Sequence, residues 1–492
     1  MKFMKLQYVT LSFVIGLLAY PSLALEKPNI LIILCDDPGY GDLACFGHPE
    51  IKTPHLNQLA REGIRFTSFY SAAPVCSPSR VGLLTGRTPN RAGVYDWIPE
   101  YREEHHARAI AHMRADEVTI PQLLKQAGYA TMMSGKWHCN SKFNSPDQPQ
   151  PCDFGFDHWF ATQNNAAPSH ENPDNFVRNG EEAGPLQGYS CGIVVDEAIT
   201  WLRKHKEKSP SQPWFAYVTY HEPHEPVVSP KNLVQQYLPK ALNEDQAQYF
   251  ANVTNLDAAT GNLLDALDQL GYAQNTLVIF TSDNGPETLY RYPNANRSYG
   301  TTGPLRGMKL HIHEGGYRVP GIMRWPARIK AGQTLDIPVC SLDFLPTFCD
   351  LAGVERPKRL LDGANFLPAL EGKPIQRERP LAWCYYNALN DSRVSLRDGN
   401  WKILGRLKGL LEVDSDKPVG EIERGIVVNK DTEALVKSTG FDRYEVYYIS
   451  KDISEKQELS SNREAPVEAL TRKLSDFYKQ LVHEQIYWDV SP

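Results

Sequence analysis

Three short apolar runs, each followed at once by polar residues, constrain the fold of this 492-residue chain more than any other feature. The runs cover residues 29–34, 214–218 and 277–280. Asp36-Asp37, the stretch from His221 to His224, and Ser282-Asp283-Asn284 follow them. Each run has the length and composition of a buried strand. Helix-compatible segments lie between them, at 55–61, 119–127, 194–205 and 247–270. This alternation predicts an α/β fold with a largely parallel sheet, in which ligands collect at the carboxyl ends of the strands.

The last quarter of the chain has a different pattern. After about Gly372, residues 393–396, 400–404 and 445–449 have the character of short strands joined by turns, which predicts a small antiparallel sheet. A final helix is expected to begin near Pro466. Its core-facing stripe consists of Leu470, Leu474, Phe477 and Leu481. Because the chain is also long for one domain, we expect a large domain over 25–375 and a smaller one over 376–492.

The first 24 residues have the features of a signal peptide. Lys2 and Lys5 precede an apolar run over 8–20, and small residues suited to cleavage end the segment at Ala24. No later run is apolar enough to span a bilayer, and no cysteine follows to carry a lipid anchor. We therefore expect an exported protein, periplasmic or secreted, without a membrane anchor. Removal of the two lysines changes the formal charge from -6 to -8, which argues against nonspecific nucleic-acid binding.

A cysteine lies at the expected start of a helix. Cys76 precedes Ser77 and Pro78, and an apolar run over 81–84 follows. Ser77 is predicted to cap the helix and Pro78 to occupy its first position, where free amides favour negative charge. On this segment alone, both a reactive thiol and a buried structural cysteine remain open.

Oxygen-bearing side chains follow two of the predicted strands. Asp36 and Asp37 end the first, and Asp283 and Asn284 end the third. Such ligands suit calcium or magnesium rather than zinc. Taken separately, these residues also fit a helix cap and a turn. Carboxylates crowded at strand ends repel one another, so a bound cation is the simpler interpretation.

Several motifs together resemble those of the type I sulfatases of the arylsulfatase family. Cys76-x-Pro78-Ser79-Arg80, followed by Leu84-Thr85-Gly86-Arg87, is similar to the signature of that family. The later motifs are Gly135-Lys136-x-His138, His224 before x-Pro226, and Lys309 ahead of the segment 314–320. The similarity runs from about Pro28 to Leu370. It implies an alkaline-phosphatase-like fold: a large mixed sheet between helices, with a smaller C-terminal antiparallel sheet of four strands and a terminal helix. The domain over 25–375 would then be catalytic.

The resemblance also implies a modified nucleophile and one metal ion. Cys76 would be converted to 3-oxoalanine (formylglycine) by a formylglycine-generating or anaerobic sulfatase-maturating enzyme. One Ca²⁺ per chain would be bound by residue 76 together with the four oxygen-bearing residues: Asp36, Asp37, Asp283 and Asn284. If Cys76 is modified, eight of the nine cysteines remain, and they allow 105 pairings. We expect Cys35 to be a buried thiol and Cys139 to pair with Cys152 as a loop staple.

The family's catalytic roles transfer to matching positions. A hydroxyl of the hydrated aldehyde attacks sulfur, and Arg80 together with calcium stabilises its oxyanion. Lys136 and Lys309 neutralise the sulfate oxygens. His224 protonates the departing sugar oxygen, and His138 accepts the proton of the second hydroxyl. His221 is expected to be structural or to face the substrate. This sequence departs from the family at His311 and His313, since family members commonly have small residues at these positions.

The substrate is less constrained. The segment 95–108 is aromatic and basic, which suits a sulfated sugar chain, although an ordinary surface loop fits equally. With His158 and Tyr292, it resembles polysaccharide sulfatases of marine bacteria, whose relatives include N-acetylgalactosamine-6-sulfatases. The substrate-binding candidates are Lys136, His224, Lys309, Trp97, His105, His106, Arg108, His170, Arg291 and His311.

The resemblance therefore implies a sulfuric ester hydrolase acting on a sulfated polysaccharide, first a galactan of the carrageenan type. The alternative is a glycosaminoglycan sulfatase, which acts on N-acetylgalactosamine sulfate. A phosphonate or phosphate-ester hydrolase is disfavoured, because Asp283-Asn284-Gly285 lacks the adjacent histidine that a second metal needs. A noncatalytic sugar-binding protein would have lost Cys76, Lys136 or an aspartate, and none is missing. The oligomeric state is left open.

Overall fold

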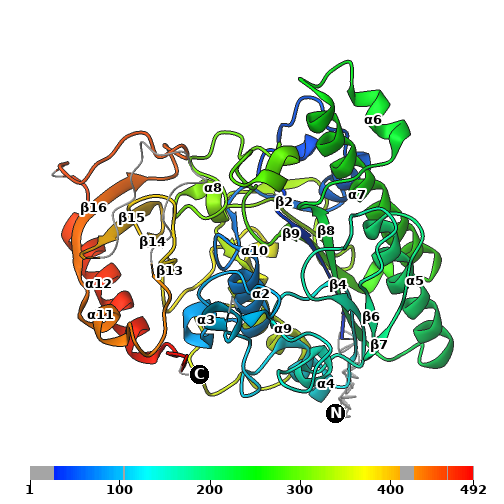
Figure 1. Cartoon of the computed structure of the whole chain (residues 1–492), viewed down its shortest axis with the longest axis horizontal. Coiled ribbons are helices and arrows are strands. Elements are labelled where there is room, and N and C mark those ends of the chain that lie inside the picture. The colour runs from blue at the N-terminus through cyan, green and yellow to red at the C-terminus, as the bar shows by residue number, and fades with distance from the viewer. Residues whose placement is uncertain (1–26, 104–105, 410–425, 463, 491–492) are drawn as a thin grey trace, which may run out of the picture.

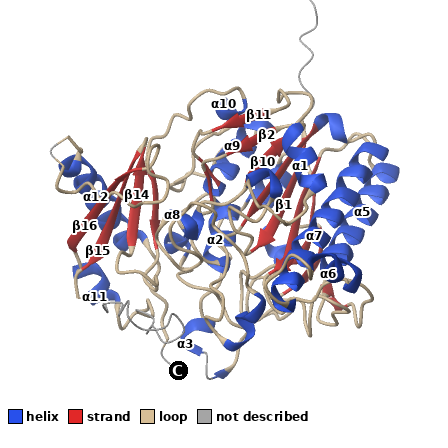
Figure 2. Ribbon diagram, turned by 90° about the horizontal axis from the view of Figure 1, so that it is seen from above, coloured by secondary structure: helices blue, strands red, loops and turns tan. Residues whose placement is uncertain are grey.

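The computed structural model describes residues 27–103, 106–409, 426–462 and 464–490 (Figure 1). The expected signal peptide lies outside these residues. Within them, no helix is long and apolar enough to cross a membrane. A ten-stranded sheet and a four-stranded sheet organise the chain, with the smaller sheet at the left in Figures 1 and 2.

The large sheet is mixed, as the resemblance implies. Its strand order is β11-β2-β10-β9-β1-β8-β4-β5-β6-β7. The central strands β1, β8, β9, β4 and β5 run parallel, and β10 is antiparallel to both of its neighbours. The central strands span Asn29–Asp36 (β1), Trp214–Pro223 (β8), Thr276–Ser282 (β9), Ala130–Lys136 (β4) and His158–Thr162 (β5). The outer strands span Gly321–Arg324 (β10), Ile64–Phe66 (β2), Gln333–Leu335 (β11), Val177–Arg178 (β6) and Glu181–Glu182 (β7).

Both faces of this sheet are covered by helices. Alternate residues of β1 enter different cores: Ile30 and Ile32 pack in the core under α2, α4 and α9, whereas Leu31 and Ile33 pack in the core under α1, α5 and α7. This two-sided burial is why the strands are apolar runs rather than alternating patterns. The covering helices span Pro54–Arg61 (α1), Cys76–Thr85 (α2), Ile120–Gln126 (α4), Ser190–Lys208 (α5), Glu244–Gln269 (α7) and Phe344–Ala352 (α9).

The remaining helices and strands are short. The short helices span His106–Ala109 (α3), Lys231–Tyr237 (α6), Glu314–Tyr317 (α8) and Leu367–Leu370 (α10). A two-stranded parallel pair joins Phe69–Tyr70 (β3) to Val339–Cys340 (β12).

The small sheet is antiparallel, in the order β13-β14-β15-β16. The residue pattern predicted β14, β15 and β16, while β13 is the fourth strand that the resemblance implies. The helix α12 packs on it through Leu470, Leu474 and Leu481, and Tyr478 is more deeply buried than the predicted Phe477. The elements span Leu381–Cys384 (β13), Val394–Asp398 (β14), Trp401–Leu407 (β15), Phe441–Tyr448 (β16), Glu433–Ser438 (α11) and Val467–Glu484 (α12).

Two local predictions are wrong. Helix α2 begins at Cys76 itself after the extended residue Val75, so Ser77 does not cap it and Pro78 is its third residue. Ser77 Oγ instead accepts a hydrogen bond of 3.0 Å from the Ile98 amide. The staple between Cys139 and Cys152 does not form, because Cys139 is buried in the core and Cys152 is exposed. All nine cysteines lie in the described part of the chain and are free thiols. Cys35 is buried, as predicted.

Candidate active site

The candidate metal ligands meet because two strands are neighbours. Cys35 of β1 pairs in register with Ser282 of β9, so the next residues, Asp36 and Asp283, lie side by side. Asp37 follows with a φ of 69°, in the left-handed region that aspartate tolerates better than most residues. Asn284 Nδ2 donates hydrogen bonds to Asp37 Oδ1 at 2.6 Å and to the Gly285 carbonyl at 2.8 Å. The three carboxylates and one amide therefore share one buried edge of the sheet.

Three cations surround these carboxylates. Lys136 Nζ lies 2.5 Å from Asp36 Oδ2, and Lys309 Nζ lies 2.7 Å from Asp37 Oδ2. Arg80 Nε donates to Asp283 Oδ2 at 2.9 Å. Gly135 places Lys136: its φ is 111°, and a Cβ at this position would lie 1.7 Å from the Thr219 carbonyl oxygen, so no other residue fits.

The donor set fits a divalent cation. Asp36 Oδ1 and Asn284 Oδ1 are buried and accept no hydrogen bond from the described residues. Donor atoms of Asp36, Cys76 and Asp283 lie within 4.8 Å of one another. Burial and Asp36 raise the pKa of Asp283 to about 7, although Arg80 and Lys136 oppose this shift. Crowded carboxylates with unused oxygens are what a hard cation stabilises.

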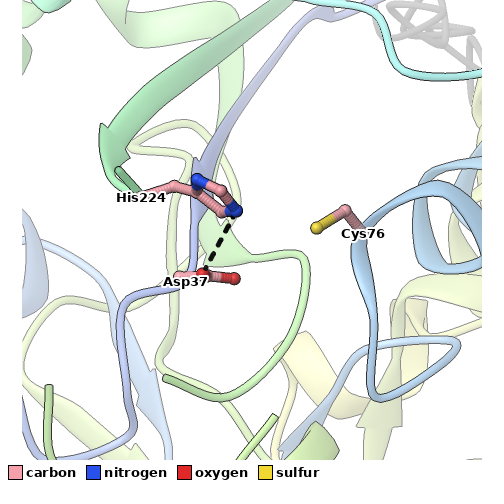
Figure 3. A group of neighbouring side chains, drawn as sticks. All are labelled: Asp37, Cys76 and His224. Atoms are coloured by element: carbon pink, nitrogen blue, oxygen red, sulfur yellow. Dashed lines mark ion pairs between the residues drawn. The ribbon is translucent and has the colours of Figure 1, made fainter. Parts of the chain in front are cut away.

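Cys76 faces this cluster from the first turn of α2. In Figure 3 its sulfur points toward Asp37 and His224, and donor atoms of these three residues also lie within 4.8 Å of one another. Burial raises the pKa of the Cys76 thiol far above its usual range, even though Lys136 and Lys309 lower it. The thiol is therefore neutral at ordinary pH. Its helix position alone does not activate it as a thiolate nucleophile.

Two histidines adjoin the cluster with different partners. His138 Nε2 lies 2.9 Å from the Ile98 carbonyl oxygen, so it carries the hydrogen, and the buried Nδ1 is left without a hydrogen-bond partner among the described residues. Burial, with Lys136 and Arg80, holds the pKa of His138 well below its usual range. His224 Nδ1 lies 2.9 Å from the Glu225 carbonyl oxygen, and its Nε2 lies 3.7 Å from Asp37 Oδ2. Burial, with Lys309, lowers the pKa of His224 to about 4.

The sulfatase family model matches residues 28–354, about two thirds of the chain. The chain belongs to the sulfatase family. It is a sulfuric ester hydrolase. A second model, N-sulphoglucosamine sulphohydrolase, C-terminal, matches residues 308–404 of this sulfatase.

Individual relatives agree with this assignment. The N-acetylgalactosamine-6-sulfatase of Rattus norvegicus is 36% identical over 398 residues, which cover 76% of this chain and 71% of that protein. Arylsulfatase A of Homo sapiens is 33% identical over 386 residues, covering 70% of this chain and 68% of that protein.

Solved structures share the fold. Ps i-CgsB, crystallised in complex with k-i-k-neocarrahexaose, matches with a TM-score of 0.76 and 25% identity over 94% of this chain and 95% of that one. A phosphonate monoester hydrolase of Agrobacterium radiobacter matches with a TM-score of 0.59 at 18% identity, over 94% and 96% of the two chains, which shows the fold alone.

Two of the predicted substrate-binding residues, Arg108 and Arg291, are paired with carboxylates. Arg108 lies 4.7 Å from the centre of the Trp97 ring and 2.5 Å from Asp96 Oδ2. Arg291 makes a corresponding pair, 2.6 Å from Glu287 Oε2, and Glu287 also lies 3.8 Å from Lys309. Trp97 packs against the same buried cluster as Cys76. The structure thus brings Trp97 and Arg108 together, and links Arg291 to Lys309.

The other predicted substrate-binding residues are histidines. His170 is completely buried, 3.2 Å from Asn252 Nδ2 and 3.9 Å from Glu222 Oε1. His311 is half-buried, with Nδ1 near the carbonyls of Met308 and Lys309. His105 and the side chain of His106 lie outside the described part of the chain.

Three further histidines that the sequence singled out lie beside polar side chains. His221 is buried in β8, with Nε2 2.8 Å from Thr162 Oγ1, and His158 lies 2.8 Å from Glu197 Oε1. His313 Nδ1 lies 3.5 Å from Glu455 Oε1. Sequence reasoning missed two buried acids, Glu225 and Glu287. Their positions in the sequence could have indicated them. Glu225 directly follows His224, and Glu287 lies two residues after Asp283-Asn284-Gly285.

Proposed function

We propose that this sulfatase removes sulfate from a sulfated carbohydrate, using formylglycine at position 76 and one Ca²⁺. The observation that carries the proposal is the buried centre itself, where residue 76 meets three carboxylates and two lysines. A neutral, buried thiol is a poor nucleophile, so this geometry is better explained by a modified residue 76.

Four residues would hold the calcium: Asp36, Asp37, Asp283 and Asn284. The cation would lower the pKa of a hydroxyl bound to it and offset negative charge on the sulfate. Formylglycine would supply a hydrated aldehyde, whose hydroxyl serves as the nucleophile.

The side chains of the protein supply positioning and proton transfer. Lys136 and Lys309 offer ammonium groups on two sides of the carboxylate cluster, where they hold sulfate oxygens. Arg80, fixed by Asp283 and by the Lys136 carbonyl at 2.9 Å, directs its guanidinium to the oxyanion at residue 76. His224 Nε2 faces the site and donates the proton to the leaving oxygen. His138 has a free Nδ1, which accepts a proton from residue 76.

Mass spectrometry tests the modification directly. Trypsin releases residues 66–80 as one peptide that contains position 76. We expect this peptide to lack sulfur and to react with carbonyl reagents when it comes from active enzyme. An unmodified thiol in fully active enzyme would contradict the proposal.

For the substrate, we propose first a galactan of the carrageenan type. Its support is Ps i-CgsB, which was crystallised with a neocarrahexaose and matches nearly the whole chain. The second candidate is an N-acetylgalactosamine sulfate ester of a glycosaminoglycan, supported by the 36% identity with N-acetylgalactosamine-6-sulfatase. Sulfate release from carrageenan and chondroitin sulfate oligosaccharides, compared by kcat/KM, decides between them. Activity on chondroitin sulfate alone would reverse the order.

We further propose that the protein is exported after removal of residues 1–24 and is matured by a formylglycine-generating or anaerobic sulfatase-maturating enzyme. The support is the charged, apolar and small-residue order of that segment. N-terminal sequencing of the exported protein should begin at Leu25. Recovery of the intact N-terminus would contradict export by this signal.

A further inference from the structure

The histidine proposed as proton donor has a carboxylate beside it. His224 Nδ1 lies 3.5 Å from Glu225 Oε2, in addition to its 2.9 Å contact with the Glu225 carbonyl oxygen. Two oxygens of one residue therefore face Nδ1. This arrangement places the hydrogen on Nδ1 and leaves Nε2 as the atom directed at Asp37 and residue 76 (Figure 3).

Glu225 is itself held in place by hydroxyl groups. Tyr292 donates a hydrogen bond to Oε2 and Ser298 donates one to Oε1, and both residues come from the segment that follows β9. The Glu225 side chain is only 4% exposed. Among the described residues, its only ion-pair partner is His224. The carboxylate is therefore fixed in a position that faces the imidazole of His224.

The two histidines of the site differ in this respect. His138 has only a neutral carbonyl oxygen at its bonded nitrogen, whereas His224 has a carboxylate. His224 therefore has a second acceptor at Nδ1, anchored by two hydroxyl groups, that holds its ring in one orientation, whereas His138 has a single carbonyl.

We propose that Glu225 is a positioning residue that orients the ring of His224, so that Nε2 can protonate the oxygen leaving the sulfur. This proposal rests on the proposed function, in which His224 is the general acid. It deepens that function by tying the site to esters of poor leaving groups, the alcohols of sugars. An aryl sulfate releases a stable phenolate and needs little protonation.

The decisive experiment compares two leaving groups in Glu225→Gln, which keeps the shape of the side chain but replaces one carboxylate oxygen, an acceptor for a hydroxyl group or for His224 Nδ1, by an NH2 group. On a sulfated oligosaccharide, kcat/KM should fall by about 10²-fold, the lower end for loss of general acid catalysis. On 4-nitrophenyl sulfate it should stay nearly unchanged. Tyr292→Phe removes one hydrogen bond to Glu225. It should lower the ratio of kcat/KM on the oligosaccharide to kcat/KM on 4-nitrophenyl sulfate by a smaller factor, and it tests the proposal if Glu225→Gln does not fold.

Asp245→Asn is the matched control. Asp245 Oδ1 lies 2.9 Å from Arg297 Nε, so it anchors the same segment but does not contact Glu225 or His224. Its ratio of sugar to aryl activity should equal that of the wild type. Equal losses on both substrates in Glu225→Gln, or no loss on either, would overturn the proposal. A wild-type enzyme that releases no sulfate from either substrate would instead contradict the proposed function.

Discussion

Two buried clusters of charge in this sulfatase are built from similar residues but differ in how completely their polar atoms are paired. One is the active centre. The other, the junction cluster of Glu314, Lys402 and Glu455, joins the segment after Lys309 to the C-terminal sheet. Lys402 Nζ lies 2.9 Å from Glu314 Oε1 and 2.8 Å from Glu455 Oε1. Glu455 Oε2 accepts a hydrogen bond of 2.7 Å from the Glu314 amide.

The junction cluster has every side-chain oxygen and nitrogen paired, whereas the active centre does not. Asp36 Oδ1, Asn284 Oδ1 and His138 Nδ1 have no hydrogen-bond partner among the described residues. The pKa shifts follow the same division. Burial raises the pKa of Glu314, but Lys402, Arg318 and Arg397 lower it to about 2. Burial, with Asp36 and Glu287, raises the pKa of Asp37 to about 6 despite Lys309. Incomplete pairing, rather than burial of charge, therefore distinguishes the active centre from the junction cluster.

The largest expected effect is on stability at the junction cluster. Lys402→Met removes the cation that two buried carboxylates share and leaves only Arg318 beside Glu314, which should lower the free energy of unfolding by about 3–5 kcal/mol. Urea unfolding measures this loss. Lys473→Met, which removes a half-exposed partner of Asp398, is the control and should cost under about 1 kcal/mol. Similar losses in the two variants would mean that the junction cluster is no more than a surface pair.

The next effect is on activity at the active centre. Lys136→Met removes a cation that holds sulfate oxygens in our proposal, so kcat/KM should fall by about 10²–10³-fold. With calcium present, the free energy of unfolding should change much less than in Lys402→Met, because the metal and Arg80 still face Asp36. Steady-state kinetics and urea unfolding of the same preparations test this. A stability loss equal to that of Lys402→Met would remove the distinction between the clusters.

The sequence predicted the active centre better than the junction cluster, because the two differ in how far apart along the chain their residues lie. The apolar runs and the polar residues after them predicted β1, β8 and β9 and the four oxygen-bearing residues of the active centre, because these signals are local. The roles of Lys136 and Lys309 followed only from the family resemblance. The pairing of Cys35 with Ser282 brings residues about 250 positions apart together, and only the sheet order supplies it. The junction cluster has no local signal, since Glu314 and Lys402 are 88 positions apart. The burial of His170 was likewise hidden, because no periodic pattern marks its segment.

Removal of metal should have an intermediate effect. A ligand present at 100 times its Kd stabilises the folded state by about 2.7 kcal/mol, so a chelator should lower the unfolding temperature and the activity together. Added Ca²⁺ should restore both. Asp37→Asn keeps the shape of the site but loses one ligand charge, so its unfolding temperature should respond much less to Ca²⁺. An equal calcium response in Asp37→Asn would place the metal elsewhere.

The smallest expected effect is a change in the free energy of unfolding at acid pH. Because the pKa of Glu314 is lowered to about 2 in the folded protein, its ionised form contributes stability above the unfolded pKa of 4.5, and this contribution is lost as the pH falls toward 2. We expect a loss of about 1 kcal/mol over the first pH unit below 4.5. Lys402→Met removes the main cause of the lowered pKa, so the stability gap between wild type and variant should narrow by that amount. Urea unfolding at pH 4.5 and 3.5 measures the gap, with Lys473→Met as the reference for general acid effects. A gap that stays constant with pH would mean that Lys402 acts mainly through its cation–π contact with Tyr317, whose ring centre is 4.9 Å from its ammonium, rather than through its ion pair with Glu314.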